Sequence, residues 1–282
     1  MHQVLISNLM AQMAKVSYQK GSQPGLANKE MVRYMVCNSL KGYIRKFGNE
    51  YGKDLVLACD SADPWRREFF PQYKASRKTS REESTNNWDH LFNLIWEIKE
   101  EIKENFPYKV IAIDNAEADD IIATIIKMQT EDKYLIISGD KDFKQLQKYS
   151  NVSQYSPIQK VMVVEDNPIR YLHEQIIKGD RSDGIPNILS PDDVFITKTK
   201  QSPITKKKLA EWSEVDDIPL GSETKKYYNR NKKLIDLEQI PNALVESIIN
   251  SFKQYEVPNR SKLLPYFIDN KLKSLIEHIN DF

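Results

Sequence analysis

Short apolar runs that end at carboxylates are the feature that most constrains this chain of 282 residues. The runs have three to five residues rich in β-branched side chains, and stretches with helical periodicity separate them. Such runs are typical of buried strands in a parallel sheet that is covered by helices. They are residues 55–59 before Asp60, residues 110–113 before Asp114, Glu117, Asp119 and Asp120, and residues 135–137 before Asp140 and Asp142. The sequence therefore predicts an α/β fold with a mostly parallel central sheet and helices on both faces.

The pattern along the rest of the chain divides it into two parts. Further strands are predicted at residues 4–6, 152–155 and 161–164, and helices at residues 29–47, 88–106 and 116–128. Past Gly179 the strand pattern stops and apolar residues recur with helical spacing. We predict an α/β domain over residues 1–178 and an all-helical domain over residues 179–282.

The acids at the strand ends predict a metal site. The carboxyl ends of parallel strands share one edge of the sheet, so these acids are expected to converge in one crevice. A further pair, Asp180 and Asp183, follows at the predicted domain boundary. Crowded carboxylates repel one another unless cations neutralise them. Because no histidine or cysteine is interleaved, the oxygen donors suit two Mg²⁺ ions, for which Mn²⁺ can substitute, and not zinc.

An acid directly after a strand is often only the N-cap of the next helix. We assign that role to Asp114, because Glu117 three residues later completes a capping-box pattern. Helical spacing places Glu117 and Asp120 on one face, with Asp119 beside them. A solvated run of charges would not recur at three strand ends, so the later acids are predicted to be functional.

Cations and aromatic rings alternate between residues 65 and 81, where six basic residues face the single acid Glu68. Guanidinium groups can hold phosphates and rings can stack on unpaired bases. The alternative interpretation is an exposed helix with a few packed rings. Beside an acidic metal site we favour nucleic-acid binding, by Arg66, Arg67, Tyr73, Lys74, Arg77 and Lys78.

Composition adds an expectation about location. The start of the chain lacks a basic leader, and no stretch is apolar for long enough to span a bilayer. The two cysteines, Cys37 and Cys59, fall in a predicted helix and a predicted strand and are expected to be buried thiols. We therefore expect a cytoplasmic protein, in the host cell if it is viral, without membrane contact.

Four motifs, in this order, resemble the flap endonuclease and 5′-to-3′ exonuclease family, and within it the ribonuclease H branch of T-even bacteriophages. They are residues 73–77 (YKASR), 117–120 (EADD), 138–143 (SGDKDF) and 179–186 (GDRSDGIP). The resemblance extends over almost the whole chain. It implies a PIN-like, flap-nuclease-like fold with an arch over residues 61–106 and C-terminal helices that grip duplex DNA.

The resemblance also implies a function. Members of this family are Mg²⁺-dependent structure-specific 5′ nucleases, with 5′-to-3′ exonuclease, ribonuclease H and flap endonuclease activities, that remove RNA primers from lagging-strand fragments. The expected partners are DNA and RNA–DNA hybrids with a 5′ end or flap, together with a single-stranded-DNA-binding protein, and the chain is expected to be a monomer.

Individual roles follow residue by residue from the same resemblance. The catalytic residues would be Asp60, Asp119, Asp140, Lys74 and Arg66, with Lys74 facing the scissile phosphate and Arg66 as its partner in the basic strip. The first-metal ligands would be Asp60, Asp119 and Asp140, supported by Glu117 and Asp120. The second-metal group would be Asp142, Asp180 and Asp183.

The chain departs from the family pattern at three places. Ser7 stands where the family has an aspartate after the first strand, which predicts reduced activity or, as an alternative function, a catalytically impaired DNA-junction-binding protein. Residues 187–191 replace the glycine-rich hairpin that forms a potassium site. Met1 lies almost on the first strand, so a clamp-binding peptide is not expected. A haloacid-dehalogenase-like phosphatase, the other alternative, would need an Asp-x-Asp where Ser7 and Asn8 stand.

Overall fold

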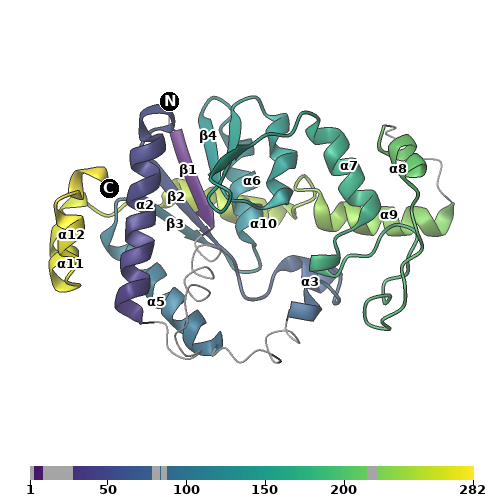
Figure 1. The fold of residues 1–282 in the computed structure, drawn as a ribbon, viewed down its shortest axis with the longest axis horizontal. Helices are drawn as coiled ribbons and strands as arrows, with labels where there is room; N and C mark the ends of the chain where they lie inside the picture. The colour runs from purple at the N-terminus through teal and green to yellow at the C-terminus, as the bar shows by residue number, and fades with distance from the viewer. Residues whose placement is uncertain (1–2, 9–27, 78–82, 84–87, 215–220) are drawn as a thin grey trace.

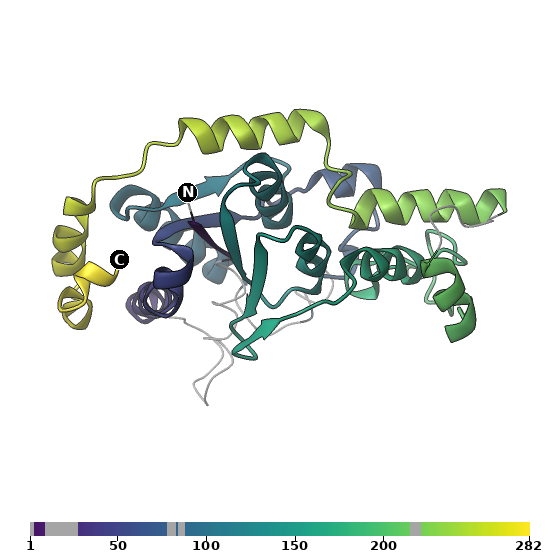
Figure 2. The ribbon, with the colours of Figure 1, turned by 90° about the horizontal axis from the view of Figure 1, so that it is seen from above.

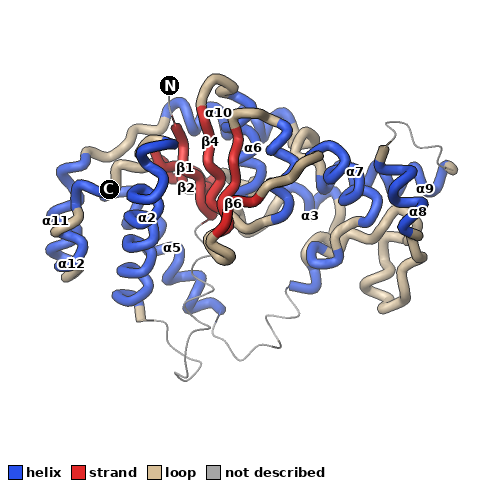
Figure 3. Tube along the Cα trace, turned by 45° about the horizontal axis from the view of Figure 1, so that its top comes forward, coloured by secondary structure: helices blue, strands red, loops and turns tan. Residues whose placement is uncertain are grey.

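A six-stranded sheet forms the centre of the protein, whose structure is a computed structural model that describes residues 3–8, 28–77, 83, 88–214 and 221–282. The strand order is β3-β2-β1-β4-β5-β6. All pairs are parallel except β5 with β6, which is antiparallel. The strands are β1 (Gln3–Asn8), β2 (Asp54–Cys59), β3 (Lys109–Ala112), β4 (Lys133–Ile137), β5 (Val152–Ser156) and β6 (Val161–Val163). The predicted mostly parallel sheet is confirmed. Figure 3 shows the strands side by side at the centre of the molecule.

Helices cover both faces of the sheet because the strand residues alternate between two hydrophobic cores. In β2, Leu55 and Leu57 face the first core, whereas Val56 and Ala58 face the second. The first core is covered by α2 (Lys29–Tyr51), α5 (Trp88–Asn105), α11 (Leu263–Asp269) and α12 (Lys273–Ile276). The second is covered by α6 (Ala118–Met128), η1 (Lys141–Lys148) and α10 (Asn242–Gln254).

The chain after Gly179 is helical, and among the described residues it pairs with itself only in the isolated bridge between Asp180 and Ile185. Residues between 188 and 228 pack into a small cluster around Ile177 and Ile188, but the last helices do not form a core of their own. Phe252 of α10 is buried in the second core and Phe267 of α11 in the first. Figure 2 shows α10 crossing over the sheet and α11 and α12 ending at the far side of the molecule. The C-terminal helices therefore wrap round the α/β part.

Three further helices, the first of which precedes Gly179, extend the molecule in the opposite direction. They are α7 (Pro168–Lys178), α8 (Lys206–Ser213) and α9 (Ser222–Ile235). In Figure 1 they lie at one end of the molecule, with the short helix α3 (Trp65–Phe69) between α5 and α9. Within the parts of the chain that the structure describes, no helix is long and apolar enough to cross a membrane.

Helix α6 begins later than the sequence predicts. The expected cap, Asp114, is not the N-cap; Glu117 is, and it forms a capping box with Asp120. The reason is a turn ahead of the helix, where Asn115 adopts a left-handed conformation with φ of 63°. The amide of Ser61 then donates to the carbonyl of Ala116 at 2.8 Å, which ties this turn to the end of β2.

Candidate active site

The site is built at the carboxyl edge of the sheet, where the chain switches direction. From β1 the strand order runs outward through β2 and β3 and then returns to β4 on the other side of β1. Such a switch point opens a crevice at the ends of the central strands. Ser7 in β1 lies opposite Leu57 in β2 and Ile137 in β4. Asp60 and Asp140 follow β2 and β4, the two strands that flank β1, so both lie at this edge of the sheet.

Three carboxylates converge tightly beside this edge. Each of Asp142, Asp180 and Asp183 offers an oxygen that lies within 4.8 Å of the other two, and among the described residues this is the one such group. Asp142 lies in the first turn of η1, Asp180 caps a single 3-10 turn and Asp183 is the last residue of that turn. The backbone after that turn needs a glycine, since Gly184 has φ of 74° and a Cβ there would lie 2.8 Å from the carbonyl oxygen of Gln72.

The electrostatics of this triplet fit a divalent cation. Burial, with the neighbouring Asp140 and Asp183, raises the pKa of Asp142 to about 7. Burial also raises the pKa of Asp183. In Asp180 burial is outweighed by Lys141 and Ser182, which lower its pKa. Acids with raised pKa values are those whose negative charge is incompletely neutralised by the protein. All donors are oxygens, as Mg²⁺ or Mn²⁺ requires.

Asp60, Asp119 and Asp140, the predicted first-metal ligands, lie near one another but converge less closely. Burial raises the pKa of Asp119 well above its usual value, and Asp140, Glu117 and Asp60 add to the rise. Asp60 accepts a hydrogen bond from the Ala118 amide at 2.8 Å, and Asp140 accepts one from the Asp142 amide at 3.0 Å. The structure thus brings the three acids into one electrostatic neighbourhood, and their ligand roles remain predictions.

Two predicted cations reach into the acidic region. Lys74 Nζ lies 2.5 Å from Glu117 Oε1 and 3.6 Å from Asp183 Oδ2. Arg77 Nη2 lies 2.6 Å from Asp183 Oδ1 and its side chain is half exposed. Lys74 has φ of 56°, and its amide donates to the Asp183 carbonyl at 2.8 Å. This left-handed turn fixes the lysine beside the triplet, where its cation can face an incoming phosphate.

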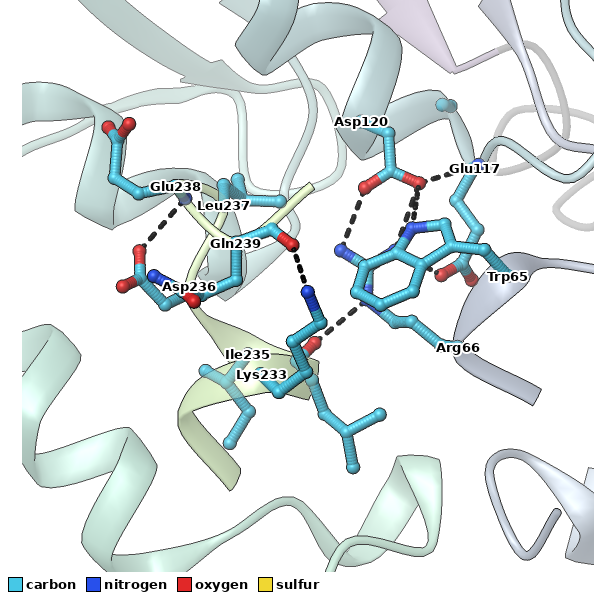
Figure 4. A network of polar contacts seen from close by, with 12 residues as sticks. Trp65, Arg66, Glu117, Asp120, Lys233, Ile235, Asp236, Leu237, Glu238 and Gln239 are labelled. Carbon is cyan, nitrogen blue, oxygen red and sulfur yellow. Dashed lines mark hydrogen bonds and ion pairs between the residues drawn. The ribbon is translucent and has the colours of Figure 1, made fainter. Parts of the chain in front are cut away.

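Arg66 has a different place from the one that the sequence predicts. Its side chain is only 3% exposed, and it donates to Asp120 at 2.8 and 3.0 Å, to Glu117 at 2.8 Å and, through Nε, to the Leu234 carbonyl at 2.8 Å (Figure 4). Both oxygens of Asp120 are occupied by donors, which include the indole of Trp65. Arg66 is therefore placed to hold Glu117 and α9, away from solvent.

Tyr73, another residue of the basic strip, lies among the acids of the site. The Tyr73 side chain is buried, and its hydroxyl donates to Glu117 at 3.0 Å and approaches Asp183 at 3.3 Å. It is thus enclosed among the acids and does not present a ring for stacking. Lys78 lies outside the described residues.

Two participants were missed by the sequence analysis. Lys141 forms an ion pair with Asp180 at 2.8 Å, and its position between Asp140 and Asp142 was a signal that could have identified it. Trp65 donates to Asp120 at 3.1 Å. No local pattern distinguishes this tryptophan from the other rings of the basic strip.

A groove of about 740 Å³ adjoins the site between α3 and α5. We call it the arch groove, because it lies within the segment predicted to form the arch. One wall holds Asp60, Lys74, Arg77 and Glu117, and the other holds Trp88, Phe92, Trp96 and Lys99. Arg67 also lines it and pairs with Asp63 at 3.2 Å. Cations, aromatic rings and acids thus share one open groove.

A parallel sheet that gathers an all-oxygen acidic site and a basic, aromatic groove at its carboxyl edge defines the class of metal-dependent enzymes that act on polyphosphates. The chain belongs to the 5′-3′ exonuclease family. Residues 13–175 match the family described as 5′-3′ exonuclease, N-terminal resolvase-like domain, and residues 169–282 match the one described as T4 RNase H, C terminal. The predicted family is confirmed, and the phosphatase alternative is not supported.

Individual relatives agree with this membership. Ribonuclease H of Enterobacteria phage T4 is 34% identical over 267 residues, which cover 90% of this chain and 88% of that protein. The solved structure of the T5 D15 protein co-crystallised with metal ions has a TM-score of 0.62 at 15% identity, over 90% of this chain and 99% of that one. A T5 D15 flap endonuclease variant in complex with DNA and metal ions has a TM-score of 0.61 at 18% identity, over 89% and 99%. These two structures show a shared flap-nuclease-like fold.

Proposed function

We propose that this protein is a Mg²⁺-dependent structure-specific 5′ nuclease that removes RNA primers during phage DNA replication. Its substrates would be DNA and RNA–DNA hybrids with a 5′ end or flap. The observation that carries the proposal is the convergence of Asp142, Asp180 and Asp183 within 4.8 Å at the carboxyl edge of the sheet, next to the arch groove. The similarity to the ribonuclease H of phage T4 supports it.

The acids would hold two ions. Asp142, Asp180 and Asp183 would bind one, and Asp60, Asp119 and Asp140 the other. Bound ions supply an activated water and stabilise the charge on a leaving oxygen. Mn²⁺ should be able to replace Mg²⁺, because both accept all-oxygen ligand sets.

The protein's own side chains would position the substrate. Lys74 and Arg77 present cations beside the triplet, where they would bind the phosphates that flank the cleaved bond. The ion pair with Glu117 orients Lys74, and Arg66 in turn pairs with Glu117. Arg66 therefore acts as a positioning residue. The exposed ring of Trp96, across the arch groove, would contact bases of the 5′ strand.

The test is cleavage of a 5′-labelled flap substrate with increasing Mg²⁺. Asp142→Asn keeps the side-chain shape and removes one charge from the triplet, so it should lower the cleavage rate by at least about 100-fold. Asp166→Asn makes the same change at an exposed acid outside the triplet and should cleave like the unmodified protein. Equal rates for the two variants would contradict the proposed metal site.

A second candidate function, a DNA-junction-binding protein with impaired catalysis, is favoured by Ser7. This residue lies in register with the ends of β2 and β4, where the family pattern has an aspartate. Mg²⁺ readily keeps several waters, so we expect a working nuclease that needs a raised Mg²⁺ concentration. Ser7→Asp should then lower the Mg²⁺ concentration for half-maximal cleavage. Junction binding without cleavage at any Mg²⁺ or Mn²⁺ concentration, with cleavage restored by Ser7→Asp, would favour the second candidate.

A further inference from the structure

A second groove, of about 800 Å³, lies between α3 and α9. We call it the α3–α9 groove. It is separate from the acidic triplet and from the arch groove, whose linings share no residue with it. The residues that matter for its chemistry are Phe69, Phe70, Lys225, Lys226, Asn229 and Lys233.

The α3–α9 groove is basic along one helix face. Lys225, Lys226, Asn229 and Lys233 recur on α9 with the three- and four-residue spacing that places side chains side by side. Lys225 and Lys226 are exposed. The one carboxylate in the lining, Asp192, is paired with the lining arginine Arg230 at 2.5 Å. The lysines therefore give the groove a net positive charge.

The floor of the groove is rigid. Arg230 is only 7% exposed, and it donates to the carbonyl of Pro186 at 2.8 Å. Its guanidinium lies 5.7 Å from the centre of the Phe70 ring. Asn231, the next residue, donates to the carbonyls of Ile176 and Pro186 at 2.7 and 2.8 Å. These bonds hold the part of α9 that carries the lysines against α7 and the turn that follows it.

Helix α3 separates the two grooves and touches the active site. Arg66 points to the acids Glu117 and Asp120, Arg67 lines the arch groove, and Phe69 lines the α3–α9 groove. Figure 1 shows α3 between α5 and α9. Through the bond from Arg66 to the Leu234 carbonyl, the same residue ties α9 to the acidic region. A ligand in the α3–α9 groove would therefore be held at a fixed distance from the site.

The exposed ring of Phe69 indicates which kind of ligand fits. This side chain is 49% exposed at the wall of a basic groove. Cations that follow a backbone, together with a ring on which a base can stack, are typical of contacts to unpaired nucleic acid. Duplex binding would use the lysines alone, because paired bases do not present their faces.

We infer that the α3–α9 groove binds an unpaired nucleic-acid strand, with Lys225 and Lys226 on its phosphates and Phe69 against one of its bases. The inference rests on the proposed function, because the strand would belong to the same substrate. It adds a second contact surface on the far side of α3 from the arch groove.

The test measures binding of a single-stranded oligonucleotide and of a duplex of the same length in EDTA, at several salt concentrations. In Lys225→Ala/Lys226→Ala the slope of log affinity against log salt for the single strand should fall by about 1.4, two phosphate contacts at about 0.7 each. The matched control is Lys253→Ala/Lys273→Ala, which removes two exposed lysines from α10 and α12. Its slope should equal that of the unmodified protein.

Phe69→Ala should weaken single-strand binding by about 5-fold or more and leave duplex binding unchanged, since a lost stacking contact affects unpaired bases alone. An unchanged slope in Lys225→Ala/Lys226→Ala, or an equal fall in the control, would overturn the groove as a binding site. Equal losses for single strand and duplex in Phe69→Ala would overturn the assignment to an unpaired strand. Because binding is read without metal, loss of cleavage in Asp142→Asn tests the proposed function separately.

Discussion

Replacement of Arg66 by methionine tests the most consequential difference between sequence and structure. The guanidinium of Arg66 forms three hydrogen bonds to the carboxylates of Glu117 and Asp120 and one to a carbonyl oxygen, with 3% of the side chain exposed. Arg66→Met keeps most of the side-chain volume but leaves two buried acids without this partner. Removal of one partner from a buried ion pair destabilises a protein by about 3–5 kcal/mol.

The expected result is a large loss of stability. For a chain of this size, about 3–5 kcal/mol corresponds to a fall in melting temperature of roughly 10 °C. Arg67→Met is the matched control, because Arg67 is 38% exposed and its ion pair with Asp63 is at the surface. Exposed pairs contribute about 1 kcal/mol or less, so this variant should melt within a few degrees of the unmodified protein.

The assay is thermal unfolding followed by circular dichroism, with nucleic-acid affinity measured at a temperature where all variants are folded. The variant Arg66→Met/Asp120→Leu removes Arg66 together with one of its two acidic partners, so the loss should be smaller than the sum of the single losses. The reasoning would be refuted if Arg66→Met had the same melting temperature as Arg67→Met and instead lost affinity for nucleic acid. Arg66 would then be the phosphate contact that the basic strip predicts.

Three further outcomes are expected. Although burial opposes it, hydrogen bonds from Arg33 and Tyr266 lower the pKa of Glu101 to about 2. The ionised Glu101 should therefore stabilise the folded protein by about 2 kcal/mol. This stabilisation is present above about pH 4.5 and is lost as the pH falls toward 2. The melting-temperature difference between the unmodified protein and Glu101→Gln should therefore shrink over that interval, and a constant difference would contradict the pairing. Lys74→Ala should slow single-turnover flap cleavage by about 100-fold at saturating substrate, and an unchanged rate would remove Lys74 from the site. Asp140→Asn should abolish cleavage and leave DNA binding equal or tighter in a gel-shift titration, because less negative charge then faces the phosphates; unaltered cleavage would exclude Asp140 as a ligand.

The central strands could be predicted from the sequence because both of their faces are buried. A strand such as β4 is apolar at every core position, and such a continuous run can be recognised from the local sequence alone. The start of α6 could not be predicted, because it depends on a left-handed turn at Asn115 that connects to Ser61 far earlier in the chain. Nor could the packing of Phe252 and Phe267 into two different cores, which depends on long-range contacts.

The candidate site shows the same division. The shared edge of parallel strands was sufficient to predict that Asp60 and Asp140 lie in one region. The exposure of each side chain in the basic strip was not predictable, because helix α3 turns Arg66 inward and Arg67 outward. Adjacent arginines have the same local chemistry, and only the surrounding packing distinguishes a positioning residue from a phosphate contact.

The course of the C-terminal helices has a consequence for how the chain folds. Helices α10 and α11 complete cores whose strands lie at least 86 residues earlier in the chain, counted from Ser156 at the end of β5 to Asn242 at the start of α10. Loops of that length carry a large closure entropy before their contacts compensate for it, so folding is expected to be slow and to finish late. During synthesis both apolar faces of the sheet remain only partly covered until the last helices emerge. The α/β half on its own should therefore be an aggregation-prone intermediate and not a stable fragment.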